Sequence, residues 1–124
     1  MSPTQWGICP NSCRAQVACV SRGNNVLVDA GSNFQRFARG FGVEAIALQA
    51  DLTDGAAVKE MFGKTLDRFG RLDVLVNCAA DWKSKRLEDV TAADVRSFLE
   101  TNTLSTFLCC QIAGLAMVAQ QEGG

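Results

Sequence analysis

Histidine and tyrosine are both absent from this chain of 124 residues. Histidine is the commonest general base in enzymes, so its absence excludes every Ser-His or Cys-His nucleophile arrangement built from these residues alone. Chemistry carried wholly by this polypeptide would need carboxylates, lysines, cysteines or a bound cofactor. The length suits one domain with a substantial core and is too short for two.

Neither sign of charge dominates, since 12 basic and 13 acidic residues give a net charge of −1. No broad basic surface is available to nucleic acid or anionic lipid, so we expect neither as a partner. No run approaches the roughly 18 apolar residues that span a bilayer, and the first residues lack a basic start followed by an apolar segment. These absences predict a cytoplasmic protein that does not enter a membrane.

Six cysteines are present, but no secretory signal places them in an oxidising compartment, so we expect reduced thiols. Zinc would need closely spaced pairs, and the spacing occurs only at Cys9 with Cys13 and at Cys109 with Cys110, so no metal site is expected. We expect Cys78, Cys109 and Cys110 to be small buried residues. A thiol-redox function ranks last, because no Cys-x-x-Cys spacing exists.

Three short apolar runs that end at polar residues predict strands of a parallel sheet. They are Val26–Val28, Ala45–Leu48 and the start of Leu72–Ala80. The third run is the most informative, because it stops at an amide, a thiol and two very small side chains. In open α/β sheets a ligand binds past the carboxyl ends of the strands, where small side chains leave room for it.

Helical spacing of apolar residues predicts two further elements. An amphipathic helix lies between the second and third strands, with Thr53 or Asp54 as its cap and Gly70 at its end, which makes a βαβ unit. A long helix is predicted from Ala92 to Gln120, after a capping-box sequence that starts at Thr91. Its apolar residues spread over more than one face, so we expect burial against the sheet and against a partner chain.

The first forty residues give weaker patterns. Arg14–Arg22 has the spacing of a helix that ends at Gly23 and leads into the first of the three strands. A second short helix is predicted within residues 34–42, where phenylalanines recur at helical spacing.

Three motifs occur in the order and at the spacing of a known family: Asp51-Leu52-Thr53, the segment Leu72–Ala80, and Glu100-Thr101-Asn102-Thr103. On these residues the chain resembles the amino-terminal portion of the short-chain dehydrogenase/reductase (SDR) family, and within it bacterial reductases of the pteridine-reductase and 3-oxoacyl-carrier-protein-reductase type. The resemblance implies an α/β fold with a partial Rossmann-type, doubly wound parallel sheet, in a single incomplete dinucleotide-binding domain over residues 1–124. It also implies that a full-length form is an oxidoreductase that reduces a small-molecule carbonyl or imine by hydride transfer from NAD(P)H.

The resemblance assigns cofactor contacts to residues at the strand ends. Asp51, followed by Leu52, falls where the family contacts the adenine, and a carboxylate suits the exocyclic amine because it accepts a hydrogen bond. Asn77, Ala79 and Ala80 fall where the family borders the cofactor ribose. Two alternatives stay open: Asp51 could only cap the helix that follows it, and the Asn77 amide could tie neighbouring strand ends together.

Asn102 is the candidate catalytic residue. In the family the matching Asn holds a water that continues a proton relay from the catalytic Lys. A polar amide is otherwise unfavourable in the interior of a helix. On periodicity alone Asn102 is a solvent-facing helix residue, so both interpretations stay open.

The phosphate-binding loop departs from the family pattern. Aligned on the start of the family's first helix, the motif Thr-Gly-x-x-x-Gly-x-Gly falls on residues 6–13, where only Gly7 is retained. Those glycines let the backbone reach the pyrophosphate, so the side chains of Asn11 and Cys13 are expected to impair NAD(P)(H) binding. The first strand is doubtful as well, because only Met1–Gln5 remain to form it and Pro3 donates no ladder hydrogen bond.

The family's later strands, with its catalytic Ser and Tyr-x-x-x-Lys, lie beyond the long helix and have no counterpart in this sequence, which holds no Tyr. Without that acid/base, hydride transfer to a carbonyl has no proton donor. We therefore expect the chain to be catalytically inactive by itself, as a fragment of a reductase. The alternative is a non-catalytic cofactor-binding or dimerising remnant that forms a homo-oligomer through the helix over residues 92–120.

Overall fold

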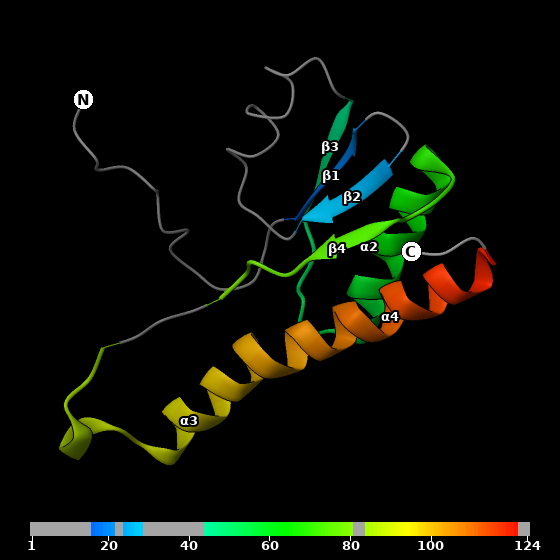
Figure 1. Cartoon of the computed structure of the whole chain (residues 1–124). Helices are drawn as coiled ribbons and strands as arrows, with labels where there is room; N and C mark the ends of the chain where they lie inside the picture. The colour runs from blue at the N-terminus through cyan, green and yellow to red at the C-terminus, as the bar shows by residue number, and fades with distance from the viewer. Residues whose placement is uncertain (1–15, 22–23, 29–43, 81–83, 122–124) are drawn as a thin grey trace, which may run out of the picture.

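A computed structural model describes residues 16–21, 24–28, 44–80 and 84–121 of the chain, which form an α/β fold (Figure 1). In chain order the elements are β1 (Gln16–Ser21), β2 (Asn24–Val28), β3 (Ala45–Leu48), α2 (Gly55–Phe69), β4 (Val74–Val76), the short 3₁₀ turn η1 (Leu87–Asp89), α3 (Ala92–Leu99), the π-helical turn η2 (Glu100–Leu104) and α4 (Ser105–Ala119). Gly7 and the segments predicted at residues 1–5 and 34–42 lie outside the described residues.

The four described strands form one mixed sheet in the order β3-β1-β2-β4. β2 pairs with β4 in parallel, whereas β1 is antiparallel to both of its neighbours, β2 and β3. β2, β3 and β4 therefore all run in the same direction, and β1 runs against them. The three predicted strands thus share one direction, but the sheet is mixed rather than parallel, because β1 lies among them and runs against them.

The helix predicted over Arg14–Arg22 is wrong, because Gln16–Ser21 is the strand β1. This segment pairs on both of its sides, from Val17 opposite Val28 in β2 to Cys19 opposite Ala45 in β3. Only two residues, with the sequence Arg-Gly, separate β1 from β2, a spacing typical of a β-hairpin. Pairing with two neighbours outweighs a weak local helical pattern in a segment that contains two valines.

α2 begins and ends at the residues that the sequence predicts. The Asp54 side chain accepts a hydrogen bond from the Ala56 backbone N–H, and Gly70 closes the helix in the left-handed conformation with φ of 79°. That φ suits glycine because it has no Cβ. The buried face of α2 consists of Val58, Met61, Phe62 and Thr65.

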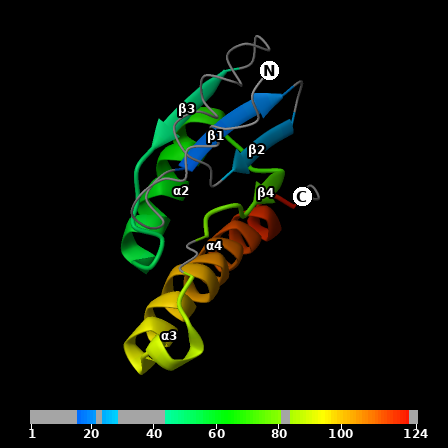
Figure 2. The same cartoon turned by 90° about the vertical axis from the view of Figure 1, so that its left-hand side faces the viewer.

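α2 and α4 pack together on one face of the sheet (Figure 2). The buried side of the long helix is made of small residues at every fourth position: Thr101, Ser105, Cys109 and Ala113. Small side chains let two helix backbones approach closely, and four-residue spacing is that of the ridges that interlock between helices. Leu75 of β4 packs against the same core, whereas Val74 and Val76 are exposed at 41% and 36%.

Helices on both faces of the sheet, which a doubly wound fold requires, stay a prediction. In the described part of the chain, α2 and α4 share the face that carries Leu75. The other face of β4 carries Val74 and Val76, which remain partly open to solvent.

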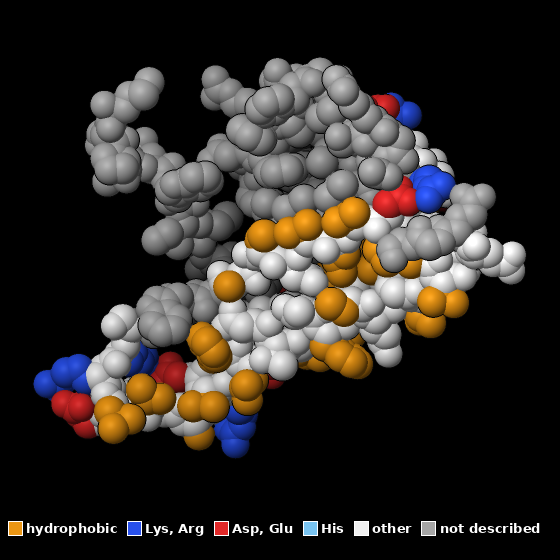
Figure 3. All heavy atoms as spheres, in the orientation of Figure 1, with side chains coloured by type: hydrophobic (Ala, Val, Ile, Leu, Met, Phe, Trp, Pro, Cys, Tyr) orange, Lys and Arg blue, Asp and Glu red, His pale blue; other side chains and the backbone are white. Residues whose placement is uncertain are grey.

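The long helix extends over the predicted residues, as α3, η2 and α4 in succession. The long helix exposes large apolar side chains, which are together called its outer side: Val95, Phe98, Leu99, Leu104, Phe107, Leu115 and Val118. Figure 3 shows hydrophobic side chains along the surface of this helix. The 28 residues Ala92–Ala119 are long and apolar enough to cross a membrane by length and composition alone, although they contain no uninterrupted apolar run of about 18 residues. An uninterrupted apolar run is not required for this, because uncharged Thr, Ser and Gln are tolerated among apolar residues.

Candidate cofactor-binding site

The carboxyl ends of β2, β3 and β4 lie at one edge of the sheet, because the three strands run in the same direction. The segments that follow β3 and β4 carry most of the residues predicted to bind a cofactor. Three strand spacings separate β3 from β4, which is about 14 Å. This edge therefore brings Asp51 and Asn77 to the same side of the sheet at a separation that an extended ligand could bridge.

Asp51 fixes the turn that leads from β3 into α2. Its Oδ1 accepts hydrogen bonds from the Thr53 backbone N–H at 3.0 Å and from the Thr53 hydroxyl at 2.8 Å. Its carbonyl oxygen accepts a further bond from the Asp54 backbone N–H at 3.2 Å. The alternative that Asp51 caps the helix is wrong, because Asp54 is the N-cap of α2. Asp51 instead holds the turn before that cap, and it is exposed, so a ligand could reach the carboxylate.

Leu52, unlike the exposed Asp51, has a buried side chain. Its side chain is fully buried in the core that α2 and α4 share. Only the backbone of Leu52 is therefore available to a ligand at this edge.

Asn77 connects β4 to α4. Its Nδ2 donates a hydrogen bond to Cys110 Sγ at 3.3 Å, whereas its Oδ1 is buried and accepts no hydrogen bond. The amide thus ties the strand to a helix, in contrast to the alternative that it ties neighbouring strand ends. A buried acceptor without a donor costs about 1–3 kcal/mol, so this position is not optimised for stability.

The cysteines near Asn77 divide by exposure. Cys109 is buried as predicted, but Cys78 and Cys110 are exposed, so the prediction of burial is wrong for both. Adjacent residues of a helix point about 100° apart, so only one of the two neighbouring cysteines on α4 can face the core. Side chains alternate between the two sides of the extended segment after β4. Cys78 is therefore exposed, whereas Asn77 and Ala79 on either side of it are half-buried.

Ala79 packs against the core and Ala80 is exposed. Two methyl side chains in succession leave the backbone after β4 open to close approach. This agrees with the space that a ligand would need past the carboxyl end of the strand.

Asn102 lies within the π turn η2 and is half-buried. Its Nδ2 donates to the Phe98 carbonyl at 3.1 Å, and its own carbonyl accepts a hydrogen bond from the Thr106 hydroxyl at 2.9 Å. The Thr101 hydroxyl donates to the Ser97 carbonyl at 2.8 Å. Side chains thus bond to carbonyls of the preceding turn through a region where the helix widens, a type of distortion that is frequent at functional sites.

The π turn is the feature of this region that apolar periodicity does not predict. A signal for it is present in the sequence, because the side chains of four nearby polar residues bond back to carbonyls of the preceding turn: Thr101, Asn102, Ser105 and Thr106.

α4 runs antiparallel to β4, because Gln120 contacts Leu72 at one end and Cys110 contacts Asn77 at the other. Asn102 precedes Cys110 by about two helical turns, or about 12 Å. It therefore lies beyond the carboxyl end of β4, on the side toward which Ala79 and Ala80 lead. The structure brings Asn77, Ala79, Ala80 and Asn102 to one region, with Asp51 further along the same edge.

A separate hollow of about 310 Å³ lies against α3 and holds none of the predicted site residues. At its margin Asp94 completes a capping box with Thr91 and accepts a hydrogen bond from Lys85 Nζ at 2.7 Å. The bond from Lys85, together with those from Thr91, lowers the pKa of the Asp94 carboxyl well below its ordinary range. Among the described residues, no cluster of three or more acidic, Cys or His side chains could hold a metal ion.

The sequence pattern of the short chain dehydrogenases matches residues 12–124 of the chain. The chain belongs to this family. Among curated SDR relatives, the 3-oxoacyl-[acyl-carrier-protein] reductase of Synechocystis sp. is 34% identical over 82 residues, which cover 66% of this chain and 33% of that protein. The peroxisomal 2,4-dienoyl-CoA reductase of Arabidopsis thaliana is 32% identical over 99 residues, 80% of this chain and 32% of that one.

Solved SDR structures show the same likeness. The NADP-bound structure of ElxO superposes with a TM-score of 0.57 at 36% identity, over 61% of this chain and 31% of that one. A short-chain dehydrogenase/reductase from Burkholderia xenovorans gives a TM-score of 0.67 at 26% identity, over 74% of this chain and 35% of that one. The chain thus spans about a third of the length of the relatives it matches.

Proposed function

We propose that this chain is the amino-terminal, cofactor-binding portion of an NAD(P)-dependent SDR oxidoreductase whose longer form reduces a small-molecule carbonyl or imine. The observation that carries the proposal is the shared edge of the sheet, where an exposed carboxylate at Asp51 and the small residues Ala79 and Ala80 follow strands that run in the same direction. The NADP-bound relative ElxO supports it at 36% identity. A cytoplasmic location accords with this proposal.

The residues of this chain fit the two ends of a dinucleotide better than its phosphates. The Asp51 carboxylate would accept a hydrogen bond from the adenine amine, and the backbone at Ala79 and Ala80 would lie against the ribose. Asn102 would orient a water molecule beside the reacting end. Gly7 would be the one remaining glycine of the phosphate loop, so we expect weak binding. The bound cofactor would supply the hydride.

We propose further that the 124-residue chain is inactive by itself. It contains no Tyr to serve as the acid that protonates the carbonyl oxygen, and no His to replace it. Turnover of NADPH with a carbonyl substrate by the purified chain would contradict this.

Titration of NADPH against the tryptophan fluorescence of the full chain tests cofactor binding. Wild-type protein should show saturable quenching, and Asp51→Asn should weaken the affinity about tenfold, because an amide group replaces one of the acceptor oxygens. The Asn side chain keeps an acceptor for Thr53, so the turn into α2 survives. Asp54→Asn, which keeps the helix cap, is the matched control and should bind as wild type does. Absence of saturable binding by the wild-type chain overturns the proposal.

A second candidate function is a non-catalytic, self-associating module. It is favoured by the exposed apolar residues on the outer side of the long helix, among which Leu115 is 68% and Val118 is 78% exposed. A helix that is apolar on all sides is usually covered on all sides. Homo-oligomers formed through this helix are compatible with cofactor binding at the sheet edge.

A further inference from the structure

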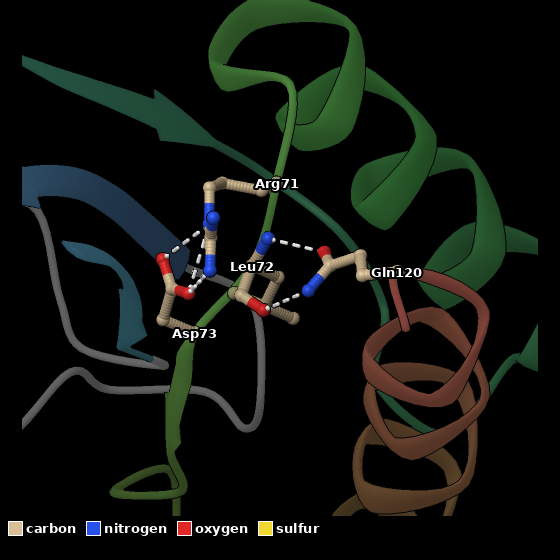
Figure 4. A network of polar contacts seen from close by, with 4 residues as sticks. All are labelled: Arg71, Leu72, Asp73 and Gln120. Atoms are coloured by element: carbon tan, nitrogen blue, oxygen red, sulfur yellow. Dashed lines mark hydrogen bonds and ion pairs between the residues drawn. The ribbon is translucent and has the colours of Figure 1, made fainter. Parts of the chain in front are cut away.

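The carboxyl end of α4 is joined to the chain just before β4 by a closed pair of hydrogen bonds. Gln120 ends α4, and its Oε1 accepts a bond from the Leu72 backbone N–H at 2.7 Å, whereas its Nε2 donates to the Leu72 carbonyl at 2.9 Å. A primary amide presents one acceptor and donors side by side, as the backbone of a neighbouring strand does. The Gln120 side chain thus makes the two hydrogen bonds with the Leu72 backbone that a neighbouring strand would make (Figure 4).

Leu72 and the residues on either side of it are held in place by several contacts. Its side chain is fully buried in the core. The residues on either side of it are paired, because Arg71 Nε donates to the two carboxylate oxygens of Asp73 at 2.9 Å and 3.2 Å. The Asp73 side chain is only 9% exposed. Movement of Leu72 would therefore disturb the core and a largely buried carboxylate together.

A second polar contact joins the same two elements further along, where Asn77 Nδ2 donates to Cys110 Sγ at 3.3 Å. From Leu72 to Asn77 the extended chain covers about 16 Å. From Cys110 to Gln120 the helix covers about 15 Å. The two contacts therefore fit a single antiparallel alignment of α4 on β4.

The contacts between these two points are apolar. Between these two points Ala113 of α4 is buried, and Ile112 and Met117 are half-buried against the same core. Apolar packing is non-directional, so these side chains hold α4 against the core without selecting hydrogen-bond partners at its ends. The directional contacts at the two ends add that selection.

We propose that Gln120 is a positioning residue that fixes the axial position of α4 along β4. Through α4, it determines where Cys110 meets Asn77 and where the π turn with Asn102 lies relative to the carboxyl end of β4. Its effect on a cofactor rests on the proposed function, whereas the alignment of α4 rests on the contacts alone.

The side-chain length and both polar atoms of Gln120 are required for this role. Methionine has a similar length but offers no donor to the Leu72 carbonyl and no good acceptor to its N–H. Asparagine keeps the amide but is one methylene shorter, so it cannot make both bonds from the same helix position. Gln111 is exposed on α4 and provides the matched control, as Gln111→Met.

The experiment compares wild type, Gln120→Met, Gln120→Asn and Gln111→Met as full chains. Amide hydrogen exchange at Leu72, measured by NMR relative to Phe62 in the same sample, should become about tenfold faster in both Gln120 variants. The rate at which iodoacetamide labels Cys110, resolved by peptide mass spectrometry against Cys78, should also change about threefold or more, because the contact with Asn77 shifts. Gln111→Met should change neither rate.

Two results would overturn the proposal. If exchange at Leu72 and Phe62 accelerates equally, Gln120 contributes only to global stability. If Leu72 exchange accelerates while Cys110 labelling stays at the wild-type rate, Gln120 is a local cap and does not position α4. A wild-type chain that fails to bind NADPH contradicts the proposed function, and the two rates still decide the role of Gln120.

Discussion

Phe62 and Phe107 carry identical side chains, one buried and one exposed. Phe62, on α2, is 1% exposed and lies in the core, whereas Phe107, on α4, is 56% exposed. Removal of a buried phenylalanine ring loses its transfer free energy and leaves a cavity. Phe62→Ala should therefore lower the free energy of unfolding by about 3–5 kcal/mol in urea titrations.

Phe107→Ala is the matched control and should lower the free energy of unfolding of dilute protein by less than about 0.5 kcal/mol. Equal losses for the two variants would show that the outer side of the long helix is as well packed as the core.

Single residues of the site were predictable where the chemistry is local. Asp51 follows a strand and precedes a helix, so both its position at the sheet edge and its bonds to Thr53 follow from the nearby sequence. The contact of Asn77 with Cys110 joins residues far apart in the chain, and nothing in either segment alone indicates it. The exposure of Cys78 and Cys110 depends on that same packing.

The start of α3 is an element whose stability depends on pH. Asp94 accepts hydrogen bonds from the Thr91 backbone N–H at 2.9 Å and from Lys85 Nζ at 2.7 Å. These bonds lower the pKa of Asp94 in the folded state below its unfolded value of about 3.9. The stabilisation is therefore complete above the unfolded pKa, and it is lost progressively as the pH falls below it toward the folded pKa.

We expect the amides in the first turn of α3 to exchange faster at pH 3 than at pH 6, after correction for intrinsic rates. Asp94→Asn should remove this difference, because the amide does not titrate in this range. Protection that is independent of pH in the wild-type chain would show that the capping box does not hold the helix start.

Elements were predicted when the residues that determine them lie close together in the chain, and were missed when those residues lie far apart or act through side chains that apolar periodicity does not show. The ends of α2 depend on Asp54 and Gly70, which act within one helical turn, and both were predicted. The Thr91 capping box is equally local. β1 depends on strands to either side of it, and its own residues carried a misleading helical pattern. The π turn η2 depends on back-bonding side chains whose effect on helix width is not visible in apolar periodicity.

At the scale of the whole molecule, the outer side of the long helix exposes several large apolar side chains. If homo-oligomers form through this side, a charge at its centre should dissociate them. Leu115→Asp should convert an associating wild-type chain into monomers in sedimentation velocity at micromolar concentration, because an exposed carboxylate would become buried without a partner.

Gln49→Asp adds the same charge at an exposed position on the sheet edge and should leave the association unchanged. A wild-type chain that sediments as a monomer would contradict association through this helix.

The mixed sheet also has a consequence for the order in which the molecule folds. The pairing of β1 with β2 closes only the few residues between Ser21 and Asn24, whereas the pairing of β2 with β4 brings Val26 to Val74. Contacts that are close in sequence form early because they cost little loop entropy, and distant parallel pairings form late. We therefore expect a hairpin at the centre of the sheet to appear first, with β4 joining it only after α2 has formed.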